Sequence, residues 1–290
     1  MPNAIPQAID DHTAAAIAKA TAARQWPRYL LSSVFAGAFV GFAVVLMVAV
    51  SAPLVAEGSG IAKLVQGSVF GVALVLVVFA GAELFTGNAM VMLQGWWRRL
   101  VGPADVARVW GLSLVGNLIG SIALAAAVHG GGTLTGPGAN LIAAVTAAKD
   151  SASGPQLFWR AVLCNALVCL ALWMATRATT DGAKIACLWF ALLAFIGSGF
   201  EHSIANMTIF GLGVFEGSTS WGALVRNLAW TVPGNVVGGG LVIGLGYAWL
   251  AGSRVPAPAT AESASVTTDL VAGAERADDL IGAAQVPAVG

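Results

Sequence analysis

Three ionisable side chains stand within long apolar stretches of this chain: Glu83, Glu201 and His202. A charge at the centre of a bilayer costs about 2.5 kcal/mol or more, so such side chains usually face a protein interior or a polar path. An imidazole titrates near neutral pH and can donate either a hydrogen bond or a proton. The three residues therefore indicate proton or hydrogen-bond chemistry inside an apolar surrounding.

The two glutamates occupy matching positions, in Gly81-Ala82-Glu83 and in Gly199-Phe200-Glu201. Glycine followed by a carboxylate in mid-span is typical of a broken helix. We interpret both carboxylates as structural acceptors for the backbone N–H groups that a break frees. The alternative interpretation is a proton relay.

His202 stands where the first half of the chain has Leu84. One interpretation is a histidine that only bridges two helices. We adopt the other, in which the imidazole meets a weak-acid anion and lets it cross as the neutral acid. The hydroxyl of Thr86 could bind His202 or the substrate, or merely bond to its own helix.

Lys149 lies in a long polar connection. Its position in the sequence is that of an ordinary solvated loop lysine. In the other interpretation it lies beside the outer opening of a pore, where a lone positive charge would attract anions.

Composition indicates the surroundings of these residues. Hydrophobic residues make up 58% of the 290 residues and charged residues 10%, against about 25% charged in soluble domains, and the mean hydropathy is +0.82. The 36 glycines allow membrane helices to approach closely. The formal net charge of zero gives no sign of a nucleic-acid partner. We therefore predict an all-α integral membrane protein embedded in a lipid bilayer.

Apolar runs of about 20 residues define candidate spans. Six occur, at residues 29–53, 61–97, 104–128, 157–178, 183–214 and 224–251. The second and fifth are too long for one straight helix and carry the glycine–glutamate motifs. Residues 28–252 are therefore predicted to form a six-helix transmembrane domain with broken second and fifth helices.

The two halves of this domain resemble each other at one offset. Glu83 and Glu201 are 118 positions apart (201 − 83), as are Asn88 and Asn206, and the pairs Gly116-Asn117 and Gly234-Asn235. Three spans per repeat place the second half upside down in the membrane. Inverted repeats bring their special residues together near the midplane, as in channels and transporters.

The distribution of basic residues predicts the orientation of the chain in the membrane, and composition predicts the nature of its two ends. Of the 14 basic residues, only Lys63, Lys149, Arg160 and Arg226 fall on the side opposite the N-terminus, so both termini are predicted to be cytoplasmic. Residues 1–27 are predicted to form an amphipathic helix lying along the cytoplasmic face. Residues 253–290 are predicted to form a disordered cytoplasmic tail.

Enzyme motifs are absent from the sequence. The chain has three histidines and no HExxH, GxSxG or Walker-type phosphate loop. The three cysteines all lie in apolar stretches and indicate buried thiols. We expect no enzyme, no metal and no cofactor. A membrane-embedded enzyme using Glu201 and His202 is an alternative that lacks a third catalytic partner.

Four stretches together resemble the formate/nitrite transporter family: GAELFTGN (81–88), LCNALVCLALWMA (163–175), GFEHSIANM (199–207) and PGNVVGGG (233–240). The likeness covers residues 28–251. It implies a homopentamer of aquaporin-like protomers in the bacterial cytoplasmic membrane, each with its own pore. An aquaporin proper is an alternative, but the Asn-Pro-Ala motifs of that family are replaced here by Asn88-Ala89-Met90 and Asn206-Met207-Thr208.

The resemblance also implies roles for individual residues. His202 would be the central pore histidine, Thr86 its hydrogen-bonding partner and Lys149 the vestibule lysine. Apolar constrictions would be formed by Phe70, Leu74 and Phe85 on one side and by Val168 and Phe195 on the other. Pore-lining amides would be Asn165 and Asn235, and the helix-break positions Glu83, Glu201, Asn88 and Asn206.

The implied function is proton-coupled passage of small monovalent weak-acid anions, formate and nitrite. Two apolar constrictions bar hydrated ions because dehydrating a charge is costly. Hydrosulfide carriers share these motifs and remain an alternative.

Overall fold

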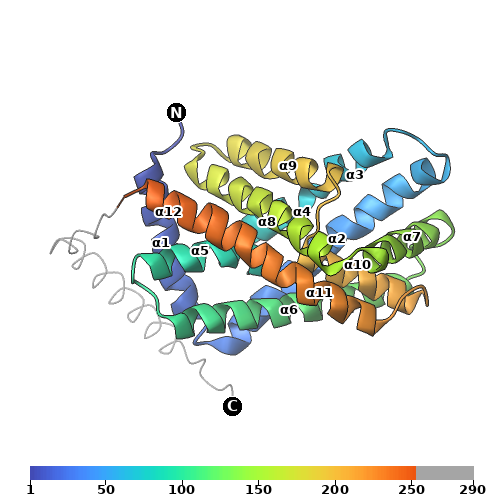
Figure 1. Ribbon diagram of the computed structural model, residues 1–290, viewed down its shortest axis with the longest axis horizontal. Coiled ribbons are helices and arrows are strands. Elements are labelled where there is room, and N and C mark those ends of the chain that lie inside the picture. The colour runs from blue at the N-terminus through green and yellow to red at the C-terminus, as the bar shows by residue number, and fades with distance from the viewer. Residues whose placement is uncertain (253–290) are drawn as a thin grey trace, which may run out of the picture. The chain divides into compact units, whose positions relative to one another are not determined.

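The computed structural model describes residues 1–252, and within that range all regular structure is helical. The predicted tail, residues 253–290, lies outside the described residues. In chain order the elements are α1 (Ile5–Ala22), α2 (Trp26–Ala56), α3 (Ala62–Phe70), α4 (Val72–Phe79), α5 (Phe85–Trp97), α6 (Pro103–Gly130), α7 (Pro137–Ser151), α8 (Gly154–Arg177), α9 (Asp181–Gly197), α10 (Ser203–Phe215), α11 (Trp221–Asn235), η1 (Val236–Leu245) and α12 (Gly246–Leu250) (Figure 1).

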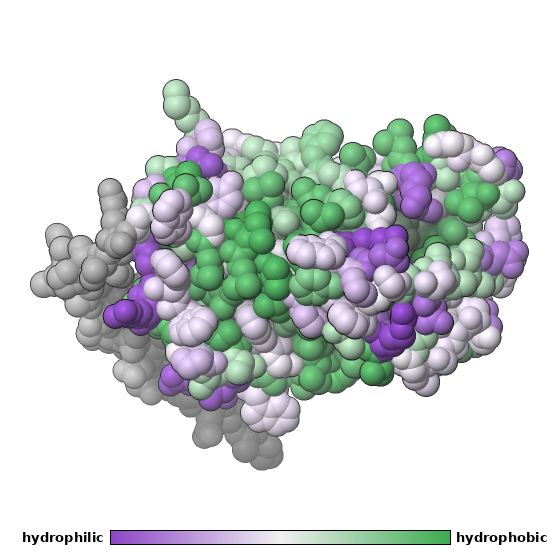
Figure 2. Space-filling model, in the orientation of Figure 1, coloured by the Kyte–Doolittle hydropathy of each residue, from purple (hydrophilic) through white to green (hydrophobic). Residues whose placement is uncertain are grey.

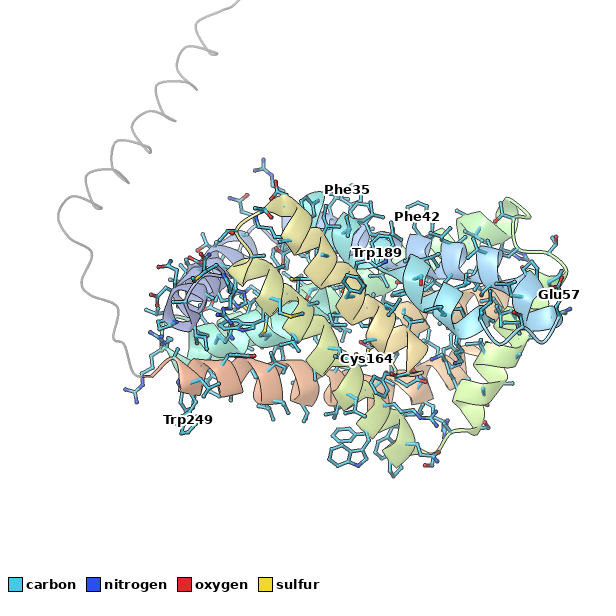
Figure 3. The ribbon with its side chains drawn as sticks, turned by 90° about the horizontal axis from the view of Figure 1, so that it is seen from above. Phe35, Phe42, Glu57, Cys164, Trp189 and Trp249 are labelled. Atoms are coloured by element: carbon cyan, nitrogen blue, oxygen red, sulfur yellow. The ribbon has the colours of Figure 1, made fainter. Side chains whose placement is uncertain are left out.

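Helices of the described residues carry large apolar side chains on their outer faces. Phe35 and Phe42 on α2 and Trp249 on α12 are exposed and project away from the ribbon in Figure 3. Hydrophobic residues also cover the middle of the face in Figure 2. Such surfaces are stable in lipid and not in water. The chain is a multi-pass membrane protein.

Five helical stretches of the described residues are long and apolar enough to cross a membrane: 26–56, 62–79, 103–130, 154–177 and 221–250. The predicted fifth span, residues 183–214, is divided between α9, of 17 residues, and α10, of 13 residues. The count of six spans therefore stays a prediction.

Both predicted helix breaks are present. α4 ends at Phe79 and α5 begins at Phe85, while α9 ends at Gly197 and α10 begins at Ser203. Within the breaks, Gly81 and Gly199 have φ of +75° and +73°, a left-handed conformation that glycine adopts without steric cost. The glycines of the two motifs therefore turn the chain just ahead of each glutamate.

The 118-residue offset relates whole helices as well as motifs. α5 and α10 begin at 85 and 203 and end at 97 and 215, and α4 and α9 end at 79 and 197. α6 and α11 begin at 103 and 221. The internal repeat predicted from three short motifs is thus a repeat of structural elements.

Glycines bring two pairs of helices into backbone contact. A Cβ atom on Gly120 of α6 would overlap the carbonyl oxygen of Val34 on α2. A Cβ on Gly238 of the π-helical segment η1 would overlap the carbonyl oxygen of Val162 on α8. Gly238 is the counterpart of Gly120 (238 − 120 = 118). Each half therefore uses a glycine at the same place to pack two of its helices at minimal separation.

α1 packs against the bundle, mainly on α5 and also on α6 and α8 (Figure 1). Its buried residues include Ala8, Ile9, His12 and Ala16. The apolar face of α1 is thus covered by protein, and its position along the cytoplasmic face of the membrane stays a prediction.

Candidate functional site

A buried asparagine satisfies the backbone at the first break. The Asn117 side-chain oxygen accepts the N–H of Phe85 at 2.9 Å. Its amide nitrogen donates to the carbonyls of Glu83 at 2.9 Å and Ser33 at 2.7 Å. One side chain thus ties α2 and α6 to the start of α5.

The second break repeats this arrangement. The Asn235 oxygen accepts the N–H of Ser203 at 2.9 Å, and its nitrogen donates to the carbonyls of Glu201 at 3.0 Å and Ala161 at 2.8 Å. The prediction that the break glutamates accept these freed N–H groups is therefore wrong. An amide suits this position better because it supplies both the acceptor and the donor that a break requires.

The first glutamate is the centre of a polar cluster. Glu83 accepts from the Lys19 ammonium at 2.6 and 2.8 Å, from the Tyr29 hydroxyl at 2.8 Å and from the Asn88 amide at 3.0 Å. Charge-assisted bonds of this kind are about twice as strong as neutral ones. The predicted break position Asn88 is thereby joined to Glu83.

The second glutamate has the corresponding partners. Glu201 accepts from the Lys149 ammonium at 2.8 Å and from the Asn206 amide at 2.7 Å. Asn206 also donates to the side-chain oxygen of Asn227 at 2.8 Å. The predicted lone charge of Lys149 is therefore an ion pair with the break glutamate.

Lys19 is the residue that the sequence reasoning missed. It pairs with Glu83 as Lys149 pairs with Glu201, but the two lysines are 130 positions apart (149 − 19). Ser33 and Glu83 are 50 positions apart (83 − 33), whereas Ala161 and Glu201 are 40 apart (201 − 161). A search at the 118 offset therefore passes over the pair, because the offset grows to 128 at Ser33 and Ala161 and to 130 at the two lysines.

His202 is held by hydrogen bonds at both ring nitrogens. Its Nδ1 accepts the N–H of Ala205 at 3.2 Å, which caps α10, and its Nε2 lies 3.1 Å from the Thr86 hydroxyl. A backbone N–H can only donate, so Nδ1 is unprotonated and the neutral ring carries its proton on Nε2. Nε2–H therefore donates to Thr86. The predicted contact between the two residues is confirmed.

A small apolar cavity adjoins His202. Its volume is about 10 Å³, close to the smallest space that holds one water. The Phe70 and Phe195 rings meet edge to face at 5.6 Å, and Phe195 stacks on His202 at 5.9 Å. The lining residues are Val40, Phe70, Ala73, Leu74, Leu84, Val168, Leu192, Phe195 and His202. Four predicted constriction residues, Phe70, Leu74, Val168 and Phe195, thus meet around one narrow space.

Phe85 lies apart from that lining. Its ring packs against Trp110, with ring centroids 6.3 Å apart. Leu84, the counterpart of His202, borders the cavity instead. The residue that ends each break, and not the one after it, therefore points toward the narrow space.

Asn165 is buried behind His202 and Thr86. It donates to the carbonyls of Thr86 at 3.1 Å and Asn235 at 2.6 Å. These bonds join the start of α5 to the second break. For Asn165 and Asn235 a pore-lining role stays a prediction, and their observed contacts are with the backbone.

Two wider cavities lie at the two helix breaks. The first, of about 530 Å³, is bordered by α1, α4 and α5 and includes Lys19, Glu83 and Leu84. The second, of about 240 Å³, includes Lys149 and Glu201. Each wide cavity contains one lysine–glutamate pair, and Leu84 borders both the first and the narrow cavity. The two wide cavities, here called the mouths, each hold a charged pair, whereas the narrow space is lined mainly by apolar side chains.

His12 on α1 links the first mouth to the N-terminal helix. Its ring is 5% exposed and bonds to Gln94 and Thr176, both at 2.7 Å. Burial lowers the pKa of His12, opposed by the Gln94 hydrogen bond. The neutral ring therefore favours the docked α1.

We expect the docking of α1 to weaken as the pH falls below about 6.5, the ordinary histidine value. The undocked state binds a proton there before the docked state does. Hydrogen exchange of the α1 amides in detergent should rise between pH 7 and pH 5. His12→Gln, which cannot titrate, should remove this pH dependence, and an equal rise in that variant would contradict the assignment to His12.

A multi-pass protein with two polar mouths and an apolar narrowing around a histidine is a membrane channel or transporter. Its family is shown by comparison with known proteins. The family model described as formate/nitrite transporter matches residues 7–249, and the chain belongs to that family, whose members are transporters and channels and not enzymes.

Individual members of this family are similar to the chain in sequence and in fold. The chain is 38% identical over 238 residues to the nitrite transporter NirC of Salmonella typhimurium strain LT2, covering 81% of this chain and 87% of that protein. Its fold matches a solved FNT family ion channel with a TM-score of 0.79 and 37% identity, over 85% of this chain and 99% of that one. It also matches a pentameric formate channel with formate bound, with a TM-score of 0.68 and 28% identity, over 78% and 97%.

Proposed function

We propose that this protein moves small monovalent weak-acid anions, formate and nitrite, across a bacterial cytoplasmic membrane together with protons. The relatives named for these anions support the substrates, and the pentameric neighbour supports a homopentamer. The positive-inside pattern supports cytoplasmic termini.

One observation carries the mechanism: His202, whose ring is bonded to Thr86, borders an apolar space too narrow for a hydrated ion. A bare anion would lose its hydration without compensation there. A neutral acid loses far less and can still accept or donate one hydrogen bond. Protonation before the narrowing therefore opens the path to weak acids and excludes anions of strong acids.

The hydrogen bonds indicate how the pair acts. The N–H of Ala205 donates to Nδ1, and Nε2–H donates to Thr86. Among the described residues the Thr86 hydroxyl has no other hydrogen-bond partner, so its hydrogen is free to bind a substrate oxygen. Protonating Nδ1 would break the cap of α10. The ring is therefore proposed to stay neutral. The anion is proposed to take its proton from a hydronium ion in the water of the wide cavity, which leaves a water molecule behind.

The test is uptake of formate and nitrite, measured separately, into proteoliposomes with and without an inward proton gradient. His202→Asn should lower uptake about twofold to tenfold, because a hydrogen bond between neutral groups contributes about 0.5–1.5 kcal/mol. Asparagine is a good N-cap residue, so α10 should keep its first turn.

Thr86 provides the matched pair of variants. Thr86→Ser keeps the hydroxyl and should retain most uptake, whereas Thr86→Val should lose it as His202→Asn does. If the liposomes take up hydrosulfide but neither formate nor nitrite, the proposed substrates are wrong and the proposed mechanism stands. Full formate uptake by His202→Asn would reduce the histidine to a structural role.

A further inference from the structure

The second wide cavity carries more positive charge than its ion pair requires. Three cationic side chains border it, Lys63, Lys149 and Arg160, but only one carboxylate, Glu201. The cavity therefore has a net charge of +2 (3 − 1). A concave, partly apolar space with unbalanced charge concentrates ions of the opposite sign.

Lys149 does not supply this excess. Its ammonium lies 2.8 Å from the Glu201 carboxylate, and the two side chains are 14% and 3% exposed. A buried pair of this geometry is close to neutral when seen from the cavity. The charge left to attract an anion belongs to the other two residues.

Lys63 and Arg160 are both exposed, and neither has an ion-pair partner among the described residues. Both are nevertheless placed at the second helix break. A Cβ on Gly199 would lie 3.9 Å from the Lys63 ammonium, and the backbone carbonyl of Arg160 accepts the N–H of Glu201 at 3.3 Å. They come from α3 and α8, on two sides of the same opening.

The first wide cavity, which contains Lys19 and Glu83, has no such unpaired cations among the described residues. Its cationic side chains Lys19 and Lys184 each have a carboxylate partner, Glu83 at 2.6 Å and Asp181 at 3.1 Å. The excess charge is therefore a property of one end of the path and not of the repeat.

We propose that Lys63 and Arg160 form an anion-binding site at the mouth of the second cavity, which collects formate or nitrite before the Lys149–Glu201 pair is reached. An ammonium and a guanidinium can each donate to the two oxygens of a planar monovalent oxyanion. The substrate named here rests on the proposed function, whereas the site itself rests on charge and geometry.

The experiment measures binding and transport separately on the full-length protein. Line broadening of ¹³C-formate in NMR titrations of detergent-solubilised protein reports binding, and proteoliposome uptake reports transport. The double variant Lys63→Gln/Arg160→Gln should raise the Kd about threefold to tenfold at low salt. The difference should vanish near 0.5 M salt, where screening removes it.

Arg226→Gln is the matched control. It removes one positive charge from the same side, where Arg226 is exposed and lies 3.7 Å from Asp150 outside the cavity lining. Lys63→Arg, which keeps the positive charge, should keep the wild-type Kd. The Kd for Arg226→Gln should stay within twofold of wild type.

An unchanged Kd in the double variant, or an equal change in Arg226→Gln, would overturn the site. Absence of any formate binding to the wild type would overturn it as well. If wild-type protein binds formate with the expected dependence on Lys63 and Arg160 but liposomes take up none, the proposed function fails and the site stands.

Discussion

Gly120→Val is expected to abolish accumulation of folded protein. A side chain at this position of α6 overlaps the carbonyl oxygen of Val34 on α2, and backbone cannot move aside as a side chain can. Overpacking costs about 1–3 kcal/mol where side chains can adjust, and more where they cannot. The measurement is the yield of monodisperse protein by gel filtration.

Gly111→Val is the matched control, because Gly111 lies on the same helix with open space around its Cβ position. The intrinsic cost of valine in a helix is the same at both positions. Gly238→Val should fail like Gly120→Val, since Val162 of α8 stands where Val34 stands in the first half. Equal yields for the Gly120 and Gly111 variants would show that the two helices can separate.

Lys149→Gln is expected to destabilise the protein by about 3–5 kcal/mol, because it leaves Glu201 buried without a counter-charge. The double variant Lys149→Gln/Glu201→Gln should recover most of this loss. Thermal unfolding in detergent can be followed by the reactivity of the buried thiols of Cys164 and Cys169, which unfolding exposes.

Two other pairs provide a graded comparison. Lys19→Gln should cost less, because Lys19 and Glu83 are 22% and 20% exposed, and Lys184→Gln should change little, because it breaks a surface pair with Asp181. Equal effects at all three lysines would mean that burial does not decide their contribution. No recovery in the double variant would mean that Lys149 acts through contacts other than Glu201.

Both predictions depend on how the two halves are built. Each half contains a glycine at which two helices touch, an asparagine that satisfies a helix break and a lysine that neutralises the glutamate within it. The halves differ at the residue that ends the break, Leu84 in one half and His202 in the other, and at the partner of His202, since Thr86 has Ile204 as its counterpart. The scaffold is thus repeated, and the His202–Thr86 pair stands where the repeat is broken.

The sequence alone determined the membrane class, the positions of both breaks and the 118-residue repeat. These features depend on local properties: the length of apolar runs, glycine in a left-handed turn and motifs of a few residues. The contact between His202 and Thr86 was also predictable, because each residue lies at the start of the half-helix that follows a break.

Only the tertiary structure decided what the polar groups bind. The partners of Glu83 and Glu201 lie 64 and 52 positions away, in α1 and α7, and the acceptors for the freed N–H groups lie 32 positions away. The hydropathy pattern predicts which segments are buried in the membrane. It does not predict which of several hydrogen-bond donors contacts a given acceptor. That choice is made by packing: Gly120 and Gly238, for example, let α6 approach α2 and η1 approach α8 at their backbones.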